Sequence, residues 1–273
     1  MNAPFAEDSY GRVKRLDFVA EILARAGDSV LDVGCGTGSQ LTLPLARAFA
    51  AKRFLGIDSD AASLAEAQAG CPANARFGGD DLVGEDDRFD IVIASEVLEH
   101  VEDPAGFLAW LAGRLASGGR LILTVPNGYG PFEWASLLEV LATLSGLWPL
   151  LRRLKRALLG GGGAVEADSL AVSPHVNFFA WAELLALVDG AGLRVARRRN
   201  RTFLCGFLLD QCLPRLGLLA WNARIADRLP PGMVSDWMLE LEVAGPPHPG
   251  TWCRNGWAGW RRRLNRRRWG LAP

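Results

Sequence analysis

The chain has 273 residues, 49% of them hydrophobic, so it is long enough for one α/β domain with insertions and is not a disordered chain. Thirty Lys and Arg residues balance thirty Asp and Glu residues, and this zero net charge gives no overall attraction to nucleic acid or to an anionic membrane. Five scattered cysteines form no C-x-x-C pair, and residues 1–27 contain no signal-peptide core. We therefore expect a cytoplasmic or membrane-peripheral location.

A glycine-rich turn follows the first predicted strand. The apolar run Val30–Val33 is typical of a buried parallel strand, and Gly34, Gly36 and Gly38 come directly after it. Apolar spacing then predicts a helix over 39–49. Strand, glycine turn and helix together are typical of a cofactor cradle, because glycine lets backbone N–H groups approach a ligand and the helix N-terminus adds a positive dipole end.

An acidic residue closes the second predicted strand. The strand covers Arg53–Ile57 and ends in Asp58, which is placed to accept hydrogen bonds from two ribose hydroxyls. The glycine spacing is G-x-G-x-G, whereas a dinucleotide fold shows G-x-G-x-x-G. This spacing departs from the dinucleotide pattern, and a dehydrogenase or an empty Rossmann-like domain is the alternative interpretation of the stretch.

The stretch from Asp32 to Gly38, taken with Asp58, resembles the S-adenosylmethionine (SAM) site of class I methyltransferases. The resemblance implies that SAM is the cofactor and that the loop and the acid hold it. The residues expected to bind the cofactor here are Asp32, Gly34, Cys35, Gly36, Gly38, Asp58 and Ser59.

The next elements carry the adenine and methionine ends of the expected site. A helix is predicted over Ala61–Ala69 and a strand over Ala75–Phe77, followed by Asp80 and Asp81. In the resembled family an acid here binds the adenine amino group; Asp80 is the better match and Asp81 the second. The strand 89–94 then leads to Ser95, which is expected to border the methionine end.

The segment after this fourth strand closely resembles the corresponding segment of the family. If it is helical, Glu96, Glu99 and His100 share one face. His100 could act as a base near neutral pH. We predict that Glu96, His100 and the later His175 orient the substrate or remove its proton.

The same residues resemble a metal-binding set. Glu-x-x-Glu-His with a later histidine is similar to the metal ligands of the ubiquinone-biosynthesis O-methyltransferases and the small-RNA 2′-O-methyltransferases. The set would be Glu96, Glu99, His100 and His175, holding a Mg²⁺- or manganese-like cation that orients the substrate hydroxyl. The alternative is a metal-free arrangement in which these side chains only order the loop.

The remaining elements complete the predicted fold. The resemblance runs from Val30 to Asn127 and resumes over 173–181. Alternating strands and helices predict an α/β, Rossmann-like, doubly wound, mostly parallel seven-stranded sheet with helical lid insertions. The resemblance implies an antiparallel last strand. The further helices are expected at 105–115 and 183–188, and the further strands at 120–125, 193–196 and 236–243.

Two apolar insertions and a basic tail interrupt or follow this core. The first insertion carries one apolar helical stripe from Trp134 to Leu151, which we interpret as a lid over the site, with an interfacial membrane helix as the alternative. The expected parts are the N-terminal helix 1–27, the SAM-binding core 28–130, the lid insertion 131–172, the rest of the core 173–245 with a second insertion 203–229, and a flexible Arg/Trp-rich tail 246–273.

We therefore expect a SAM-dependent methyltransferase that acts on an oxygen of a small, partly apolar molecule such as a quinone precursor, lipid or secondary metabolite. The expected partners are an apolar or amphipathic substrate and a membrane surface contacted through 131–159 and the tail. The alternatives are an RNA methyltransferase that uses the basic tail, although we do not expect a nucleic-acid partner, and a non-catalytic SAM-binding or membrane-docking module.

Overall fold

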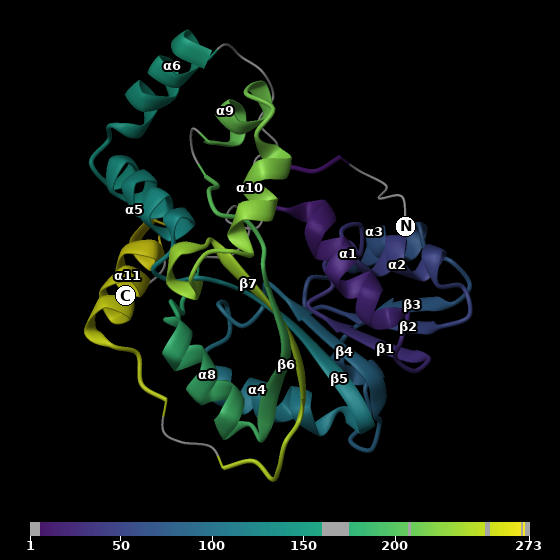
Figure 1. The fold of residues 1–273 in the computed structure, drawn as a ribbon. Helices are drawn as coiled ribbons and strands as arrows, with labels where there is room; N and C mark the ends of the chain where they lie inside the picture. Colours follow the sequence, from purple (N-terminus) through teal and green to yellow (C-terminus); the bar gives the residue numbers. More distant parts are fainter. Residues whose placement is uncertain (1–5, 160–174, 207–208, 249–251, 269, 271–273) are drawn as a thin grey trace.

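One seven-stranded sheet organises the molecule (Figure 1), with the strand order β3-β2-β1-β4-β5-β7-β6. The computed structural model describes residues 6–159, 175–206, 209–248, 252–268 and 270. The strands are β1 (Ser29–Val33), β2 (Arg53–Ile57), β3 (Ala75–Gly78), β4 (Phe89–Ser95), β5 (Leu115–Pro126), β6 (Leu193–Asn200) and β7 (Asp236–Val243).

Strands β1 to β5 are parallel, and β7 lies antiparallel between β5 and β6. Strand β1 pairs with both β2 and β4. The chain therefore adds β2 and β3 on one side of β1 and then β4 and β5 on the other side. In an open α/β sheet such a switch point is where the carboxyl ends of the strands leave room for a ligand. The doubly wound, mostly parallel sheet and its antiparallel last strand are confirmed.

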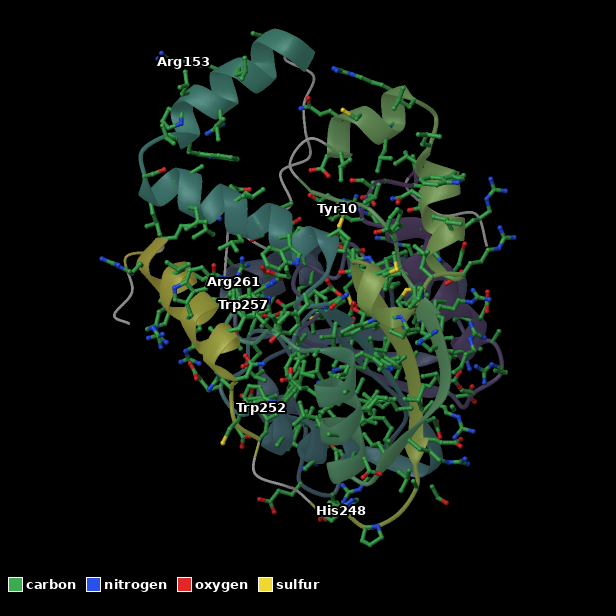
Figure 2. The ribbon with its side chains drawn as sticks, turned by 60° about the vertical axis from the view of Figure 1, so that its left-hand side comes forward. Tyr10, Arg153, His248, Trp252, Trp257 and Arg261 are labelled. Carbon is green, nitrogen blue, oxygen red and sulfur yellow. The ribbon has the colours of Figure 1, made fainter. Side chains whose placement is uncertain are left out.

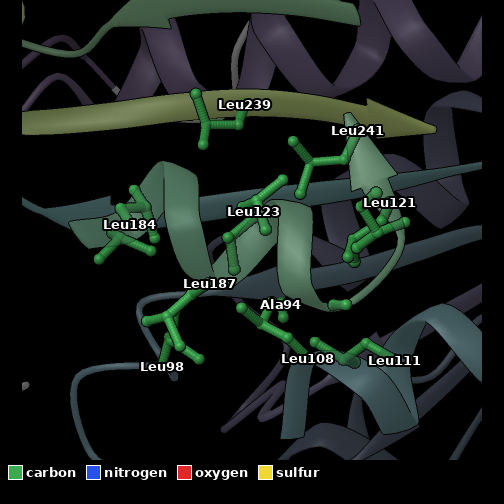
Figure 3. Close-up of a cluster of buried hydrophobic side chains, with 14 of the residues drawn as sticks. Ala94, Leu98, Leu108, Leu111, Leu121, Leu123, Leu184, Leu187, Leu239 and Leu241 are labelled. Atoms are coloured by element: carbon green, nitrogen blue, oxygen red, sulfur yellow. The ribbon is translucent and has the colours of Figure 1, made fainter. Parts of the chain in front are cut away.

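Helices cover both faces of the sheet. On one face lie α1 (Arg12–Leu23), α2 (Thr42–Ala48) and α3 (Ala61–Ala69), whose apolar side chains form one buried cluster with the strands. On the other face lie α4 (Pro104–Gly113) and α8 (Trp181–Gly190). Figure 3 shows this second cluster, in which leucines of α4 and α8 meet leucines of β5 and β7. The two cores hold the carboxyl edge of the sheet in place.

Most predicted boundaries agree with the structure to within three residues, and three elements start at a different residue from the one predicted. Helix α2 begins at Thr42 rather than residue 39, because the loop before it stays in left-handed conformations at Gly36 and Gly38. Helix α4 begins earlier, at Pro104, where Asp103 caps it by accepting from the Gly106 N–H at 3.0 Å. Strand β5 begins at Leu115, before an irregular stretch that ends near Arg120.

The first insertion is two helices rather than one continuous stripe. Helix α5 (Pro131–Leu144) and helix α6 (Trp148–Leu159) meet at a bend of 118°, with Gly146 at a φ of 75° between them. Within the described residues no single helix is long and apolar enough to cross a membrane; these two pass that test only together, as a bent pair. The part of the expected lid from 160 to 172 lies outside the described residues.

The second insertion forms α9 (Leu209–Arg215) and α10 (Leu219–Ala226). In the tail, α11 (Gly256–Arg268) packs against α5, on the side of the sheet's carboxyl edge (Figure 1). The prediction of a flexible tail is therefore wrong over this helix. The reason is that its arginines include a buried one, Arg261, which a solvated tail would not hold.

Candidate active site

The loop after β1 brings the backbone close to an open space. Gly34 and Gly36 adopt left-handed φ values of 71° and 54°. A Cβ atom added at Gly34 would lie 2.5 Å from Cγ2 of Val97, so this position tolerates no side chain. A Cβ added at Gly36 meets no atom within 4 Å. A ligand could therefore approach the backbone at Gly36.

The amide groups of this loop fasten it to the end of β2. The N–H groups of Gly34 and Cys35 donate to the carbonyl of Ile57 at 2.8 and 3.1 Å, and the N–H of Gly36 donates to Oδ2 of Asp58 at 2.7 Å. We expected loop amides to face a ligand, but these three are bonded within the chain. The glycines thus contribute close approach and a fixed loop shape rather than these donors.

The two aspartates of the predicted cofactor set differ in environment. Asp58 is half-buried, and its second oxygen accepts the N–H of Asp60 at 2.9 Å, so each oxygen keeps a lone pair for a ligand. Ser59 beside it is exposed. Asp32 is buried and accepts the hydroxyl of Thr42, and burial, only partly offset by that bond, raises the pKa of Asp32 to about 6. Asp32 therefore fastens α2 to β1.

The adenine-side candidates lie one strand further along the sheet. Asp80 and Asp81 begin a 3₁₀ turn, Asp80–Leu82, directly after β3, and both side chains are exposed. Strand β3 pairs with β2 as far as Gly78, opposite Ile57, so these acids and Asp58 share one edge. Either aspartate can reach an adenine amino group placed along that edge.

Arg15 of α1 reaches the ends of the glycine loop and of β4. Its guanidinium donates to Oγ of Ser95 at 3.2 Å and to the side chain of Gln40, and Ser95 also hydrogen-bonds Thr124 at 2.8 Å. Arg15 is buried, and its Nε has no hydrogen-bond partner among the described residues. Sequence reasoning missed Arg15, although an arginine beside Leu16 on the apolar side of a helix was an available signal.

Glu96 does not join the other acidic and histidine candidates. Its φ of 58° lies in the left-handed region, and the segment after β4 forms turns instead of the helix that would align 96, 99 and 100. Its carboxylate accepts from Thr124 at 2.7 Å and pairs with Arg201 at 3.0 Å. Burial opposes ionisation of Glu96, but the charges of Arg201 and Arg15 together with the Thr124 hydrogen bond outweigh it and lower the pKa of Glu96. The prediction of Glu96 as a metal ligand is therefore wrong.

Three of the four predicted metal ligands do come together. One ligand atom from each of Glu99, His100 and His175 lies within 4.8 Å of the other two. The rings of His100 and His175 meet edge to face, with centroids 5.0 Å apart. Glu99 is 1% exposed, and neither of its carboxyl oxygens has a hydrogen-bond partner among the described residues. Burial, with the nearby Glu96, raises the pKa of Glu99 to about 8.

A buried carboxylate from the first insertion orients His175. Glu133 of α5 lies 2.6 Å from Nδ1 of His175, and its other oxygen accepts from Arg261 of α11 at 2.8 Å. Burial alone would lower the pKa of His175, but the charge and hydrogen bond of Glu133, together with the charges of Glu99 and Glu96, outweigh burial and raise that pKa to about 9. The hydrogen bond to Glu133 turns the Nε2 side of the ring away from Glu133.

Helix α11 holds both sides of this cluster. Asn265 donates to the carbonyl of His175 at 3.1 Å, and Arg262 makes two hydrogen bonds of 2.8 Å to Glu102, three residues after Glu99. Figure 2 shows Arg261 on the inner side of this helix. Sequence reasoning missed the roles of Glu133 and Arg261, because a lone acid in an apolar helix and one arginine of a basic run both resemble ordinary solvated side chains.

The three clustered side chains offer the kinds of atom that bind a metal ion. A buried carboxyl group without a hydrogen-bond donor, beside two imidazoles, is the kind of site that a metal ion satisfies, and the Glu133–His175 contact is the usual support for a metal-bound histidine. Glu99, His100 and His175 therefore fit a cation. Two nitrogens and one carboxylate suit a first-row transition metal better than the Mg²⁺ expected from the sequence, since Mg²⁺ prefers oxygen ligands alone.

The fold is that of a doubly wound α/β protein that binds a nucleotide-like cofactor. At the carboxyl edge of its sheet an acid follows β2 and a polar cluster follows β4. The family model described as "Methyltransferase domain" matches residues 7–197, which is more than half of the chain. The chain belongs to the class I SAM-dependent methyltransferase family.

Two relatives and one solved structure illustrate the similarity. The chain is 39% identical over 176 residues to a trans-aconitate 2-methyltransferase of Deinococcus radiodurans, covering 64% of this chain and 62% of that one. It is 36% identical over 118 residues to a ubiquinone biosynthesis O-methyltransferase of Xanthomonas euvesicatoria, covering 41% and 49%. PKMT2 from Rickettsia typhi, solved with AdoHcy, shares the fold at a TM-score of 0.56 and 15% identity, covering 91% and 56%. The chain thus spans about half to three-fifths of these curated relatives.

Proposed function

We propose that this chain transfers a methyl group from SAM to an oxygen atom of a small, partly apolar molecule. The observation that carries the proposal is the placement of two different sites on one sheet edge. Asp58 and the open Gly36 lie at the ends of β2 and β1, and the Glu99–His100–His175 cluster follows the neighbouring β4. A methyl donor held at the first site can face an acceptor held at the second.

The residues on the cofactor side each meet a different part of SAM. SAM supplies the methyl group and the positive charge that makes its methyl carbon electrophilic. Asp58 accepts hydrogen bonds from the ribose hydroxyls, and Asp80 or Asp81 accepts from the adenine amino group. Among the described residues the Nε of Arg15 has no hydrogen-bond partner, and its buried positive charge suits the carboxylate at the methionine end beside Ser95.

On the acceptor side the three clustered residues take different roles. With a pKa raised to about 9, His175 is a cation near pH 7, and with a pKa raised to about 8, Glu99 is neutral there. Both then donate hydrogen bonds, so they orient an oxygen nucleophile and stabilise its developing negative charge. His100 is the remaining group that can remove the proton of the hydroxyl.

A bound cation is the alternative use of the same three side chains. Glu99 and His175 would then be deprotonated and, with His100, would hold the ion, which lowers the pKa of a hydroxyl bound to it. Turnover that survives a chelator, in protein without bound transition metal, would leave the proton-transfer roles alone. Turnover lost on chelation and restored by one metal would assign the three residues as ligands.

The proposed acceptor class follows from the surroundings of His175 and from the relatives. The aromatic rings of Phe132 and Phe178 lie with their centroids 6.3 and 6.4 Å from that of His175, and Tyr10 contacts Phe132 edge to face. Such apolar neighbours suit a ring or chain that carries a hydroxyl group. The O-methyltransferase relatives support oxygen as the acceptor atom, and the trans-aconitate relative supports a small acceptor.

The structure gives less support to an RNA substrate than the basic tail suggested. Arg261, Arg262 and Arg268 of α11 pair with Glu133, Glu102 and Glu139. These arginines are held by carboxylates of the same chain, whereas an electrostatic arm for phosphates needs them unpaired.

Calorimetry followed by turnover tests the proposed function. We expect the purified chain to bind SAM and S-adenosylhomocysteine, and to move a labelled methyl group from SAM into small hydroxylated molecules of a cell extract. Binding without any labelled product would instead identify a non-catalytic SAM-binding module. Label found in RNA or only on carbon atoms would overturn the proposed acceptor.

A further inference from the structure

The hairpin of α5 and α6 exposes an unusually apolar surface. Along α5 the exposed side chains include Trp134 and Leu138, which is 69% exposed, while Phe132 and Leu137 of the same helix are buried. Four leucines within α6 or directly before it are exposed as well. The exposed leucines of the hairpin are Leu138, Leu141, Leu144, Leu147, Leu150, Leu151 and Leu154. Soluble proteins rarely leave so many large apolar side chains together in water.

Helix α6 separates leucine from arginine around its axis. At 100° per residue, Leu147, Leu150 and Leu154 fall on one side of the helix, and Arg152 and Arg153 fall on the other. Both arginines are exposed, and Trp148–Leu159 contains no Asp or Glu. A leucine face, backed by a face on which every charged side chain is cationic, is the pattern of a helix that lies in the plane of an anionic membrane surface.

Among the described residues, the hairpin surface lies away from the core of the molecule. Helix α6 packs against α5 and stands at the outer end of the molecule, well apart from α8 and from the amino end of the sheet (Figure 1). In Figure 2, Arg153 on α6 and His248 lie at opposite ends of the molecule. A lid closed over the site would instead bury its leucines against the core.

We infer that the α5–α6 hairpin docks this protein onto an anionic lipid bilayer, with the leucines at the headgroup–acyl boundary and Arg152 and Arg153 at the lipid phosphates. Charge favours a bilayer over a second copy of the chain, because a symmetric dimer through this face would bring two cationic α6 helices together. The exposed aromatic side chains of Trp134 and Trp260, both in contact with the ring of Trp257, extend the surface with residues that prefer a membrane interface.

Vesicle flotation tests this inference independently of methyl transfer. We expect the full chain to float with vesicles in which about a third of the phosphatidylcholine is replaced by phosphatidylglycerol, with an affinity roughly tenfold above that for phosphatidylcholine alone, and to lose this preference in high salt. Replacing Leu147, Leu150 and Leu154 with Ser, or reversing charge with Arg152→Glu and Arg153→Glu, should abolish flotation.

Matched controls keep the test sharp. Val243→Ser removes an exposed apolar side chain at the end of β7, and Arg76→Glu reverses an exposed charge on β3, so both should float as the unaltered chain does. All variants should bind SAM equally, which separates a failure here from a failure of the proposed function. Flotation that is absent, or that survives the leucine variant, overturns the inference. So does a dimer of the unaltered chain that the leucine variant dissociates.

Discussion

The two sides of the sheet's carboxyl edge are built in different ways. The cofactor side is local: Gly36 and Asp58 come from consecutive strand ends, and they lie partly open to solvent. The acceptor side is buried and comes from distant parts of the chain, with Glu99 after β4, Glu133 on α5 and Arg261 on α11. A cofactor loop can thus be formed by one short stretch of backbone, whereas the cluster after β4 depends on how α5 packs against α11.

The largest effect is expected at the buried carboxylate that joins α5 to α11. Glu133→Gln leaves His175 and Arg261 without their anionic partner, and breaking a buried pair in this way costs about 3–5 kcal/mol of unfolding free energy. Glu139→Gln is the matched control on the same helix, because its partner Arg268 lies nearer the surface and such pairs contribute about 0–1 kcal/mol. Denaturant unfolding measures both; equal losses would contradict the assigned role of Glu133.

On the cofactor side, Asp58→Ala should weaken SAM binding about a hundredfold, since it removes two charge-assisted hydrogen bonds to the ribose. Stability should change little, because Asp58 is only half-buried. The exposed Asp86 supplies the control, and Asp86→Ala should leave the calorimetric dissociation constant unchanged. An Asp58 variant that binds SAM normally would remove this residue from the site.

The acceptor side should also make stability depend on pH. The pKa of His175 rises from 6.5 to about 9 on folding, so its stabilisation is complete below pH 6.5 and is lost as pH rises through about 9. The pKa of Glu99 rises to about 8, and its contribution is lost in the same direction. Metal-free protein should therefore lose on the order of 5 kcal/mol of unfolding free energy between pH 6.5 and 9, about 3 kcal/mol from His175 and about 2 kcal/mol from Glu99.

His175→Gln provides the check on that slope. The variant lacks the titrating ring, so its unfolding free energy should fall less over the same pH range. A slope identical to that of the unaltered chain would show that His175 does not gain a proton on folding.

The smallest effects distinguish two glycines of one loop. Gly34→Ala should cost about 1–3 kcal/mol of stability, because the added methyl group meets Val97 at 2.5 Å and φ is left-handed. Gly36→Ala should cost only about 1 kcal/mol, since its methyl group enters open space, yet it should weaken SAM binding. If Gly36→Ala bound SAM as tightly as the unaltered chain, the ligand would not approach the backbone there.

The sequence predicted elements well where local signals mark their ends. Strand β2, helix α3 and strand β7 have the predicted bounds, and for α3 the marks are Asp60 at its start and Gly70 after its end. The bend between α5 and α6 was missed, because the apolar spacing continues across Gly146 while the backbone turns. Periodicity reports which side of a helix is apolar and not where its axis changes direction.

The residues of the candidate site also differ in whether local sequence or tertiary structure determines their positions. Asp58 could be placed from the strand that precedes it, whereas Glu96 could not, because its left-handed φ and its partner Arg201, more than a hundred residues later, are set by tertiary structure. Glu133 and Arg261 act only through the packing of α5 on α11. Residues of this kind become visible once distant segments are brought together.

The most direct test is transfer of a labelled methyl group from SAM into small molecules of a cell extract, compared between the unaltered chain and Glu99→Leu. Leu keeps the buried volume but has no polar atom to donate to the acceptor or to bind a cation. We predict that both proteins bind SAM with the same affinity and that the variant transfers label at least about tenfold more slowly, because Glu99 helps to orient the acceptor oxygen. Transfer at an unchanged rate by Glu99→Leu would contradict the assignment of the acceptor site to this cluster.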